Sequence, residues 1–443
     1  MSPGPDSRTR PATRSQVAAW CLYDFANSSF TTLVVTFVYA TWFTKAMAPD
    51  EVTGTGRWSW AVTLSALIIA FAAPVIGARA DRRASRKRWL VGLTLTCITA
   101  TALLGLVAPP RWLLALGLFV AANVAYELGQ ALYNAFLPGL VDRRRLGLVS
   151  GIAWGLGYAG GLLSLVFGLL LCVWRVGPMA AWLPDTDGFN IRAANLVVAA
   201  WFLLFSLPAL LLLPEPAPPD PRAAASFRQL GATLRRLAGY RQAMRLLVAR
   251  LVYNDGLVTI FAFGGIYAAG TFDMSMSEII GFGITLNLAA GAGALFFGMI
   301  DDRVGGKTVI ALSLVGLIGA TLIAAMAPTR TWLWVGGVAI GLLVGPNQSA
   351  SRSLMARFVP PPRSAEFFGL YAFSGKLTSF AGPFLLGRLT TLAGSQRIGV
   401  ASVLLFFVAG GLLLWRIDEE AGKRQAEQEE ALLPTRISGE EPP

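Results

Sequence analysis

The residues of this sequence that could do chemistry are polar side chains inside long apolar runs. They occur in five of the runs: Tyr23, Asp24, Asn27 and Ser28; Glu127, Gln130 and Asn134; Tyr253, Asn254 and Asp255; Asn347, Gln348 and Arg352; and Lys376. A polar group in an apolar medium is costly unless it faces a cavity or another polar group. We therefore predict a polar pathway for a small substrate or ion, with Asp24, Asp255 and Lys376 as the leading binding residues.

The spacing of these residues fits helices. Glu127, Gln130 and Asn134 lie at positions i, i+3 and i+7, which share one helix face. Lys376 would lie about 18 Å into its run at about 1.5 Å per residue. A carboxyl group among apolar side chains takes up a proton more readily than one in water, so Asp24 or Asp255 could carry a coupling proton. A cavity that holds both a carboxylate and an ammonium would suit a zwitterionic substrate.

Each residue also has a structural interpretation. Asp24 and Asp255 could form fixed ion pairs between two halves of the protein, and Glu127 could pair with an arginine near the mouth of the pathway. Arg352 and Glu366 lie close to a polar turn, which favours a gate or a structural pair. Asn and Gln inside apolar runs hold helices together as often as they contact a ligand.

Other chemistries find no support. The sequence contains no His, and its three Cys lie in apolar runs, so we expect no His-based catalysis, no metal site and no disulfide framework. Gly306-Lys307-Thr308 resembles the end of a phosphate-binding loop, but Asp301 stands where that loop requires its first Gly. We therefore predict neither an enzyme nor a bound cofactor.

The elements that must position the polar residues are membrane-spanning helices. Of the 443 residues 55% are hydrophobic and only 14% are charged, whereas soluble domains carry about 25% charged residues. Runs of spanning length recur at 16–44, 58–80, 89–108, 112–136, 147–173, 193–213, 245–270, 276–300, 307–327, 331–355, 365–391 and 396–416. We predict an all-α membrane protein with twelve transmembrane helices: a six-helix half (1–213), a linker (214–244), a second six-helix half (245–417) and a disordered acidic tail (418–443).

Basic residues alternate between the turns. One set of turns carries most of them: Arg82, Arg83, Arg86, Lys87 and Arg88; Arg143, Arg144 and Arg145; Arg303 and Lys307; and Arg352, Arg357 and Arg363. Cations collect on the cytoplasmic side of a membrane, so both termini and the linker are predicted to be cytoplasmic. The membrane would be the plasma (inner) membrane if the protein is bacterial. This distribution accounts for the net charge of +12 without nucleic acid.

The linker combines a proline-rich start with a possible amphipathic helix. Phe227, Leu230, Leu234 and Leu237 recur at helical spacing between basic residues. The segment could lie on an anionic membrane surface or pack on the cytoplasmic face of the protein itself.

One polar turn occurs twice, about half a chain apart. Gly77 precedes Asp81-Arg82 by four residues, and Gly298 precedes Asp302-Arg303 in the same way. Such a repeat favours two related halves. The turn resembles the signature of the major facilitator superfamily, except that Ala84 stands where the family usually has Gly for a left-handed turn. The resemblance implies a cytoplasmic gate formed by Gly77, Asp81, Arg82, Asp302, Arg303, Arg352 and Glu366. It also places Asp81 near the start of the eleventh helix, where Ser364 is a plausible cap.

Further stretches resemble one branch of that superfamily, the vacuole effluxers, which are autophagy-related amino-acid effluxers and their bacterial relatives. The stretches are WCLYDFANS from Trp20, YNAFLP from Tyr133, YNDG from Tyr253, QSASRS from Gln348, EFFGLY from Glu366, and Gly375-Lys376. The resemblance implies a twelve-helix fold and efflux of small solutes, amino acids among them. We therefore expect a secondary transporter, monomeric, that binds a small solute and could be coupled to protons. The alternative is a transporter-like membrane sensor or scaffold that no longer transports.

Overall fold

The computed structural model describes residues 12–176, 183–184, 186–215 and 239–438. Every regular element in these ranges is a helix, which agrees with the all-α prediction. The amphipathic helix predicted at 227–237 lies outside the described residues.

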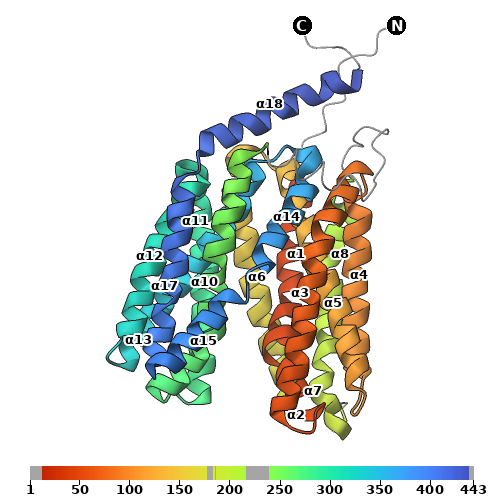
Figure 1. Ribbon diagram of the computed structural model, residues 1–443. Coiled ribbons are helices and arrows are strands. Elements are labelled where there is room, and N and C mark those ends of the chain that lie inside the picture. Colours follow the sequence, from red (N-terminus) through yellow and green to blue (C-terminus); the bar gives the residue numbers. More distant parts are fainter. Residues whose placement is uncertain (1–11, 177–182, 185, 216–238, 439–443) are drawn as a thin grey trace.

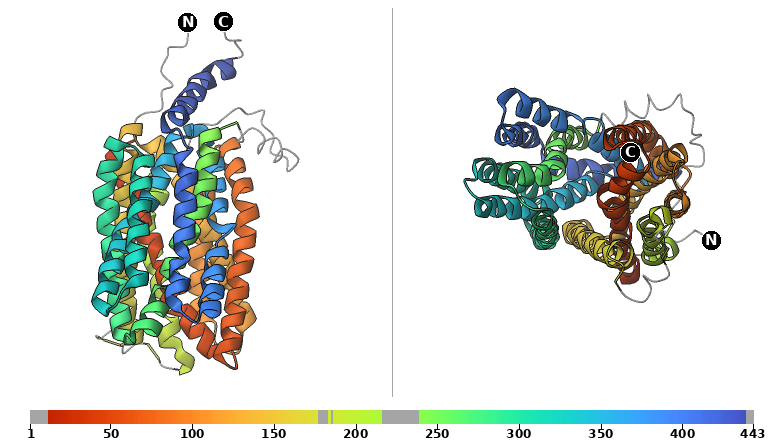
Figure 2. Two further views of the ribbon diagram at one scale, coloured as in Figure 1. Left: turned by 60° about the vertical axis from the view of Figure 1, so that its left-hand side comes forward. Right: turned by 90° about the horizontal axis from the view of Figure 1, so that it is seen from below.

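The helices form two groups that stand side by side (Figures 1 and 2). The first group contains α1 (Arg14–Ser29), η1 (Phe30–Phe37), α2 (Tyr39–Ala46), α3 (Glu51–Arg82), α4 (Arg86–Leu106), α5 (Trp112–Leu140), η2 (Arg143–Arg145), α6 (Leu146–Gly168), η3 (Leu169–Val173), η5 (Thr186–Gly188), α7 (Phe189–Arg192) and α8 (Ala194–Leu212). The second contains α10 (Arg241–Phe272), α11 (Met276–Val304), α12 (Gly306–Met326), α13 (Arg330–Arg357), η7 (Pro361–Arg363), α14 (Ser364–Lys376), α15 (Ala381–Ala393), α16 (Gln396–Ala401) and α17 (Val403–Trp415).

Within the described ranges, nine helices are long and apolar enough to cross a membrane. The other three predicted runs fall on α1 with η1 and α2, on α13, and on α14 with α15. Two of these are divided into shorter helices, and all three carry polar residues of the predicted pathway. The count of twelve spans therefore stays a prediction.

The two groups touch through α3 with α14 and through α6 with α11. Gly77 allows the first contact, because a Cβ at this position would collide with the carbonyl oxygen of Ala365 on α14. Gly298 allows the second, because a Cβ there would lie 2.9 Å from the Cα of Gly151 on α6. The glycine of the repeated turn thus permits close helix packing in both copies.

The turns α3–α4, α5–α6, α11–α12 and α13–α14 lie at one end of the molecule, which we call the basic end. Contacts join them directly: Arg86 donates to the carbonyl oxygen of Pro361 at 2.5 Å, and Arg143 donates to that of Arg357 at 2.7 Å. The basic turns predicted to share one membrane side are therefore neighbours in space.

The repeated turn uses a left-handed residue in both copies. Ala84 has φ of +44° and Gly305 has φ of +90°. Glycine adopts positive φ without steric cost, whereas an alanine there is strained by about 1–2 kcal/mol. Ala84 keeps the left-handed conformation despite that cost.

The prediction of a disordered tail is wrong for most of its length, because Glu419–Ser438 form helix α18, which lies across the basic end (Figure 1). Ala426 is fully buried, Glu429 pairs with Arg363 at 2.5 Å, and Glu430 pairs with Arg143 at 3.0 Å. The high Glu and Gln content suggested disorder, but these acidic groups match the basic turns beneath them.

Candidate functional site

Asp24 on α1 and Arg352 on α13 form a buried ion pair between the two groups of helices. Asp24 Oδ2 lies 2.8 Å from Arg352 Nη1, and the two side chains are 8% and 3% exposed. The sequence analysis placed Asp24 in the pathway and Arg352 in the gate; the structure brings them together. Of the two alternatives stated for Asp24, the geometry is that of an ion pair between the groups.

Arg352 makes three further hydrogen bonds. Its Nη1 donates to Asn134 Oδ1 at 3.2 Å, its Nε to Ser150 Oγ at 2.9 Å and its Nη2 to the carbonyl oxygen of Ser150 at 2.8 Å. Its guanidinium carbon also lies 4.9 Å from the centre of the Trp20 ring. A buried charge with this many partners is held in a single position.

The polar residues around Asp24 continue along α1 and α5. Asn27 Nδ2 lies 3.1 Å from Gln130 Oε1 and 3.4 Å from Asp24 Oδ1. Tyr23 points elsewhere: its hydroxyl bonds Thr94 Oγ1 on α4 at 2.7 Å, and its ring stacks on Tyr133. Asn27, Gln130 and Asp24 thus share one polar surface, and Tyr23 packs behind it.

A second ion pair links α5 to α14. Lys376 Nζ lies 2.6 Å from Glu127 Oε1, with 33% of the lysine side chain and 19% of the glutamate side chain exposed. The sequence analysis named both residues but not the pairing. Because this pair is more open than the pair of Asp24 and Arg352, its charges are the easier to reach from outside.

Asp255 on α10 differs from the other two acidic residues. It is 2% exposed, and its Oδ1 accepts a hydrogen bond from Thr378 Oγ1 at 3.2 Å. No cation forms an ion pair with it within the described ranges. A buried carboxylate with one hydroxyl partner and no cation is costly in its charged form.

The remaining predicted residues of α10 and α13 mostly contact each other. Gln348 Nε2 donates to Asn254 Oδ1 at 3.2 Å, and Tyr253 shares a hydrogen bond of 2.8 Å with Ser351. Asn347 turns toward α12, where its Nδ2 donates to Ser313 Oγ at 2.9 Å. Tyr253 and Asn347 therefore hold helices together, which is the alternative stated for Asn and Gln.

Sequence reasoning missed Arg250, a buried arginine on α10. Its Nη1 donates to the carbonyl oxygen of Tyr371 at 3.0 Å and to Ser374 Oγ at 3.2 Å. Its guanidinium carbon lies 3.7 Å from the centre of the Tyr371 ring. The signal was a cation inside the seventh apolar run, four residues before Asn254.

At the basic end, Asp81 caps helix α14 of the other group. Its Oδ2 accepts from the backbone N–H of Glu366 at 2.8 Å, its Oδ1 from that of Ala365 at 3.2 Å, and Arg86 Nε lies 2.5 Å away. The placement of Asp81 at this helix start is confirmed. The prediction that Ser364 caps the helix is wrong: its hydroxyl donates to the carbonyl oxygen of Ala135 at 2.7 Å.

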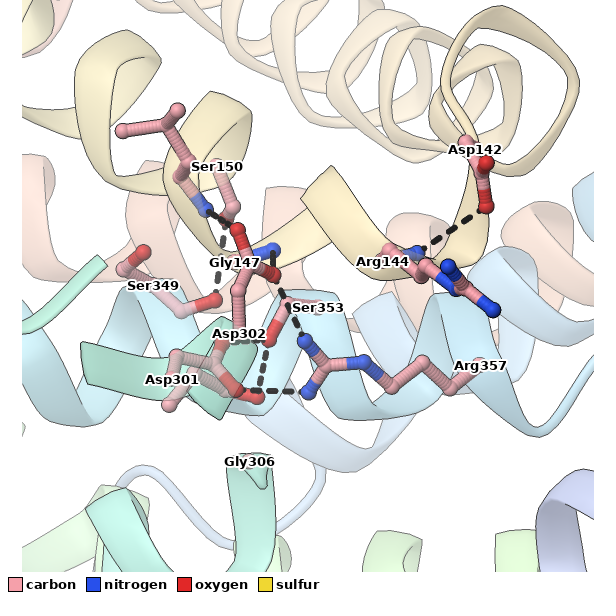
Figure 3. Close-up of polar contacts among 12 residues, drawn as sticks. Asp142, Arg144, Gly147, Ser150, Asp301, Asp302, Gly306, Ser349, Ser353 and Arg357 are labelled. Atoms are coloured by element: carbon pink, nitrogen blue, oxygen red, sulfur yellow. Dashed lines mark hydrogen bonds and ion pairs between the residues drawn. The ribbon is translucent and has the colours of Figure 1, made fainter. Parts of the chain in front are cut away.

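Asp302 makes the equivalent cap on α6 (Figure 3). Its two carboxylate oxygens accept from the backbone N–H groups of Gly147 at 2.7 Å and Leu148 at 2.9 Å. Gly147 and Leu148 are the second and third residues of α6, as Ala365 and Glu366 are of α14. The two copies of the turn therefore bind the same positions on opposite groups of helices, where the helix dipole favours an anion.

Arg357 completes this corner of the molecule (Figure 3). It lies 2.5 Å from Asp301 Oδ1 and 3.0 Å from Asp302 Oδ1, and Ser353 also donates to Asp301. Of the predicted gate residues, Arg303 is exposed and Arg82 is half-buried. Arg86 pairs with Asp81, and Arg357 pairs with Asp301 and Asp302.

Helix α18 adds contacts over the same corner. Glu419 accepts from the backbone N–H groups of Gly306 at 3.2 Å and Lys307 at 2.9 Å, which start α12.

Hydrogen bonding from the Lys423 ammonium lowers the pKa of Glu420. A cavity of about 620 Å³ between α18 and the turns includes Arg143 and Asp302 in its lining, so water reaches these charges.

The comparisons with known proteins agree with this architecture. An uncharacterized MFS-type transporter, YxiO of Bacillus subtilis (strain 168), is 27% identical, covering 94% of this chain and 98% of that protein. Autophagy-related protein 22 of Coccidioides immitis (strain RS) is 22% identical, covering 96% and 90%. Among solved structures, the major facilitator superfamily transporter FucP in its outward conformation superposes with a TM-score of 0.75 at 15% identity, covering 91% of this chain and all of that one.

The fold and the helices of spanning length define an integral, multi-pass membrane protein of the major facilitator superfamily, a class of transporters and not of enzymes. The family model described as "Vacuole effluxer Atg22 like" matches residues 58–427. The chain belongs to this vacuole effluxer family. Within the described ranges, no cluster of three or more His, Cys, Asp or Glu residues could hold a metal ion.

Proposed function

We propose that this protein is a secondary active transporter that exports small solutes such as amino acids by alternating access. In this proposal α1–α8 and α10–α17 are two six-helix halves of a twelve-span membrane domain, divided at the linker. The runs at α1–α2, α13 and α14–α15 also span, and their polar residues lower their hydropathy because they line the pathway. The basic end faces the cytoplasm, with both termini and the linker on that side.

The ion pair between Glu127 and Lys376 carries this proposal. It joins the two halves, contains both signs of charge, and is partly exposed. A solute that carries an ammonium and a carboxylate can take over both partners at once: its carboxylate pairs with Lys376 and its ammonium with Glu127. Binding then replaces one ion pair by two, so the charges never stand unpaired in a cavity of low dielectric constant.

In this proposal the ion pair between Asp24 and Arg352 closes the pathway and does not bind the solute. Asp24 and Arg352 are almost fully buried, and with the caps made by Asp81 and Asp302 they tie the halves together toward the basic end. We infer that this arrangement is closed to the cytoplasm and open to the other side. Opening to the cytoplasm would break the Asp24–Arg352 pair and both caps.

Asp255 is the proposed proton carrier. A buried carboxyl group without a cation has the chemistry to exchange a proton each time the site changes its exposure. This proposal separates the roles of the acidic residues: Asp255 moves a proton, Glu127 meets the solute, and Asp24 holds the halves.

Counterflow in proteoliposomes tests the proposal. Purified protein is reconstituted, and exchange of each member of a labelled amino-acid panel is measured with and without an imposed pH gradient. We expect exchange of at least one amino acid, lost in Lys376→Gln and in Glu127→Gln. The matched control is Arg330→Gln, which removes a cation from an exposed pair with Glu278 outside the pathway and should leave exchange unchanged.

A non-transporting sensor or scaffold is the second candidate function. The helix α18, which is paired with the turns of the basic end, supports it because such a helix could bind a partner. No exchange of any panel member by well-folded protein would contradict amino-acid transport. Deleting residues 421–443 then separates the two functions. A transporter with another substrate should retain its transport, whereas a sensor would lose its signalling part.

A further inference from the structure

Four side chains in the first group of helices form a buried polar cluster that plays no part in the proposed transport site. We call Tyr39, Thr101, Arg192 and Asn195 the outer cluster, because it lies toward the end of the molecule opposite the basic end. Each of the four residues is at most 4% exposed. Its polar atoms need partners, since buried polar groups are almost always hydrogen-bonded.

The outer cluster lacks those partners within the described part of the chain. The Tyr39 hydroxyl, Arg192 Nε and both amide atoms of Asn195 have none there. The Thr101 hydroxyl has only the Cys97 thiol, one helical turn earlier on α4, and sulfur is a weak acceptor. Four of these five atoms can donate a hydrogen bond. A buried donor without a strong acceptor is costly, so four in one place require an explanation.

The four residues converge from four elements, α2, α4, α7 and α8. A Cβ at Gly105 on α4 would lie 3.0 Å from the Arg192 carbonyl oxygen and 3.4 Å from Asn195 Cβ. Thr101 precedes Gly105 by one helical turn and therefore faces α8 as well. The Arg192 guanidinium points toward α2, with its central carbon 5.8 Å from the centre of the Trp42 ring. Tyr39 precedes Trp42 by three residues, and the two rings lie 5.5 Å apart.

The charge of the cluster is not balanced. Arg192 is buried but forms no ion pair within the described residues. Asp187 acts on it electrostatically from an exposed position. Its Nε is buried without a hydrogen-bond partner, and the groups around it are hydroxyl and amide donors. Such a set of ligands stabilises a negative charge.

We infer that the outer cluster binds a small inorganic monovalent anion of the halide type. One negative charge matches the single positive charge of Arg192. A spherical ion accepts hydrogen bonds from any direction, so it can satisfy the Tyr39, Thr101 and Asn195 donors from three helices at once. The bound ion would fasten α2, α4 and α8 to one another, and this site is independent of the proposed amino-acid site.

Thermal unfolding of the purified full chain tests the site. The melting temperature is measured in detergent with sodium chloride and then sodium bromide, replaced by sodium gluconate at constant ionic strength. We expect a saturable rise with chloride and bromide but not with gluconate. In Arg192→Gln, half-saturation should move to at least about tenfold higher chloride, because a charge-assisted hydrogen bond is lost.

Gentler variants keep the test valid if Arg192→Gln does not fold. Tyr39→Phe and Thr101→Val remove one hydroxyl each with little change of shape, and each should weaken the chloride effect several-fold. The matched control is Arg397→Gln in the second group. Arg397 donates to the carbonyl oxygen of Ala325 at 3.0 Å and lies 5.3 Å from the Phe272 ring, so its loss should leave the chloride effect unchanged.

Two results would overturn the inference. One is an equal effect of chloride and gluconate on the wild-type protein, which would mean that water alone fills the cluster. The other is the same chloride dependence in the wild type, Tyr39→Phe and Thr101→Val. Bromide anomalous scattering from crystals of the full chain gives a direct check: a peak between Arg192 and Asn195 supports the site, and bromide found only elsewhere contradicts it.

Discussion

Replacing Asp24 by Asn should destabilise the protein far more than breaking an exposed ion pair. Asp24 and Arg352 approach to 2.8 Å and are 8% and 3% exposed. At an effective dielectric constant of about 20, two charges at this distance attract by about 6 kcal/mol. Desolvation offsets part of that attraction, and removing one partner of a buried pair costs about 3–5 kcal/mol. We expect a loss of this size in the free energy of unfolding.

The double variant separates the charge from the geometry. In Asp24→Asn with Arg352→Met no charge is left unpaired, so most of the lost stability should return. The exposed pair of Glu278 and Arg330, with side chains 42% and 49% exposed, is the matched control. Breaking it with Glu278→Gln should cost far less than breaking the buried pair, because water and salt screen exposed charges.

Unfolding in mixed detergent micelles is followed by loss of helical circular dichroism during a titration with dodecyl sulfate. It is measured for five proteins: the wild type, Asp24→Asn, Arg352→Met, the double variant and Glu278→Gln. The reasoning would be refuted by an Asp24→Asn variant that loses no more stability than Glu278→Gln. It would also be refuted if the double variant were as unstable as the sum of its single variants, because the two charges would then not act on each other.

Three further predictions concern other parts of the molecule. Ala84→Gly should raise the free energy of unfolding by about 1 kcal/mol, measured in the same titration, because φ at this residue is +44°. Replacing Glu429 and Glu430 by Gln should increase proteolysis of α18 but cost less than about 1 kcal/mol per pair, since both ion pairs are partly exposed. Asp255→Asn should abolish the effect of a pH gradient in the counterflow assay while solute exchange continues; an undiminished gradient effect would contradict the proton role.

The sequence was a good guide to which residues belong to the polar interior and a poor guide to how they pair. Spacing along a helix predicts a shared face, which is why Glu127, Gln130 and Asn134 were identified together. It does not predict which helix faces them. Only the structure shows that Glu127 pairs with Lys376 and that Asn134 accepts a hydrogen bond from Arg352.

The sequence misjudged how deep some residues lie, because a helix can extend beyond the end of its apolar run. Arg352 was placed at a turn because other arginines follow it, but α13 continues to Arg357 and keeps Arg352 inside the bundle. Arg250 was overlooked although it lies inside a predicted apolar run. The tail was misjudged because composition describes the segment alone, whereas α18 is ordered by basic turns far away in the sequence.

The repeated turn explains how one local motif can control the whole molecule. A carboxylate that capped a helix of its own group would stabilise that group whatever the other group did. Asp81 and Asp302 instead each bind the second and third N–H groups of a helix in the opposite group. In the proposed transport cycle, both caps would therefore be lost together if the groups separated at the basic end. Because each cap satisfies otherwise unpaired N–H groups, the alternating access proposed above would pass between two distinct states rather than through a continuous range.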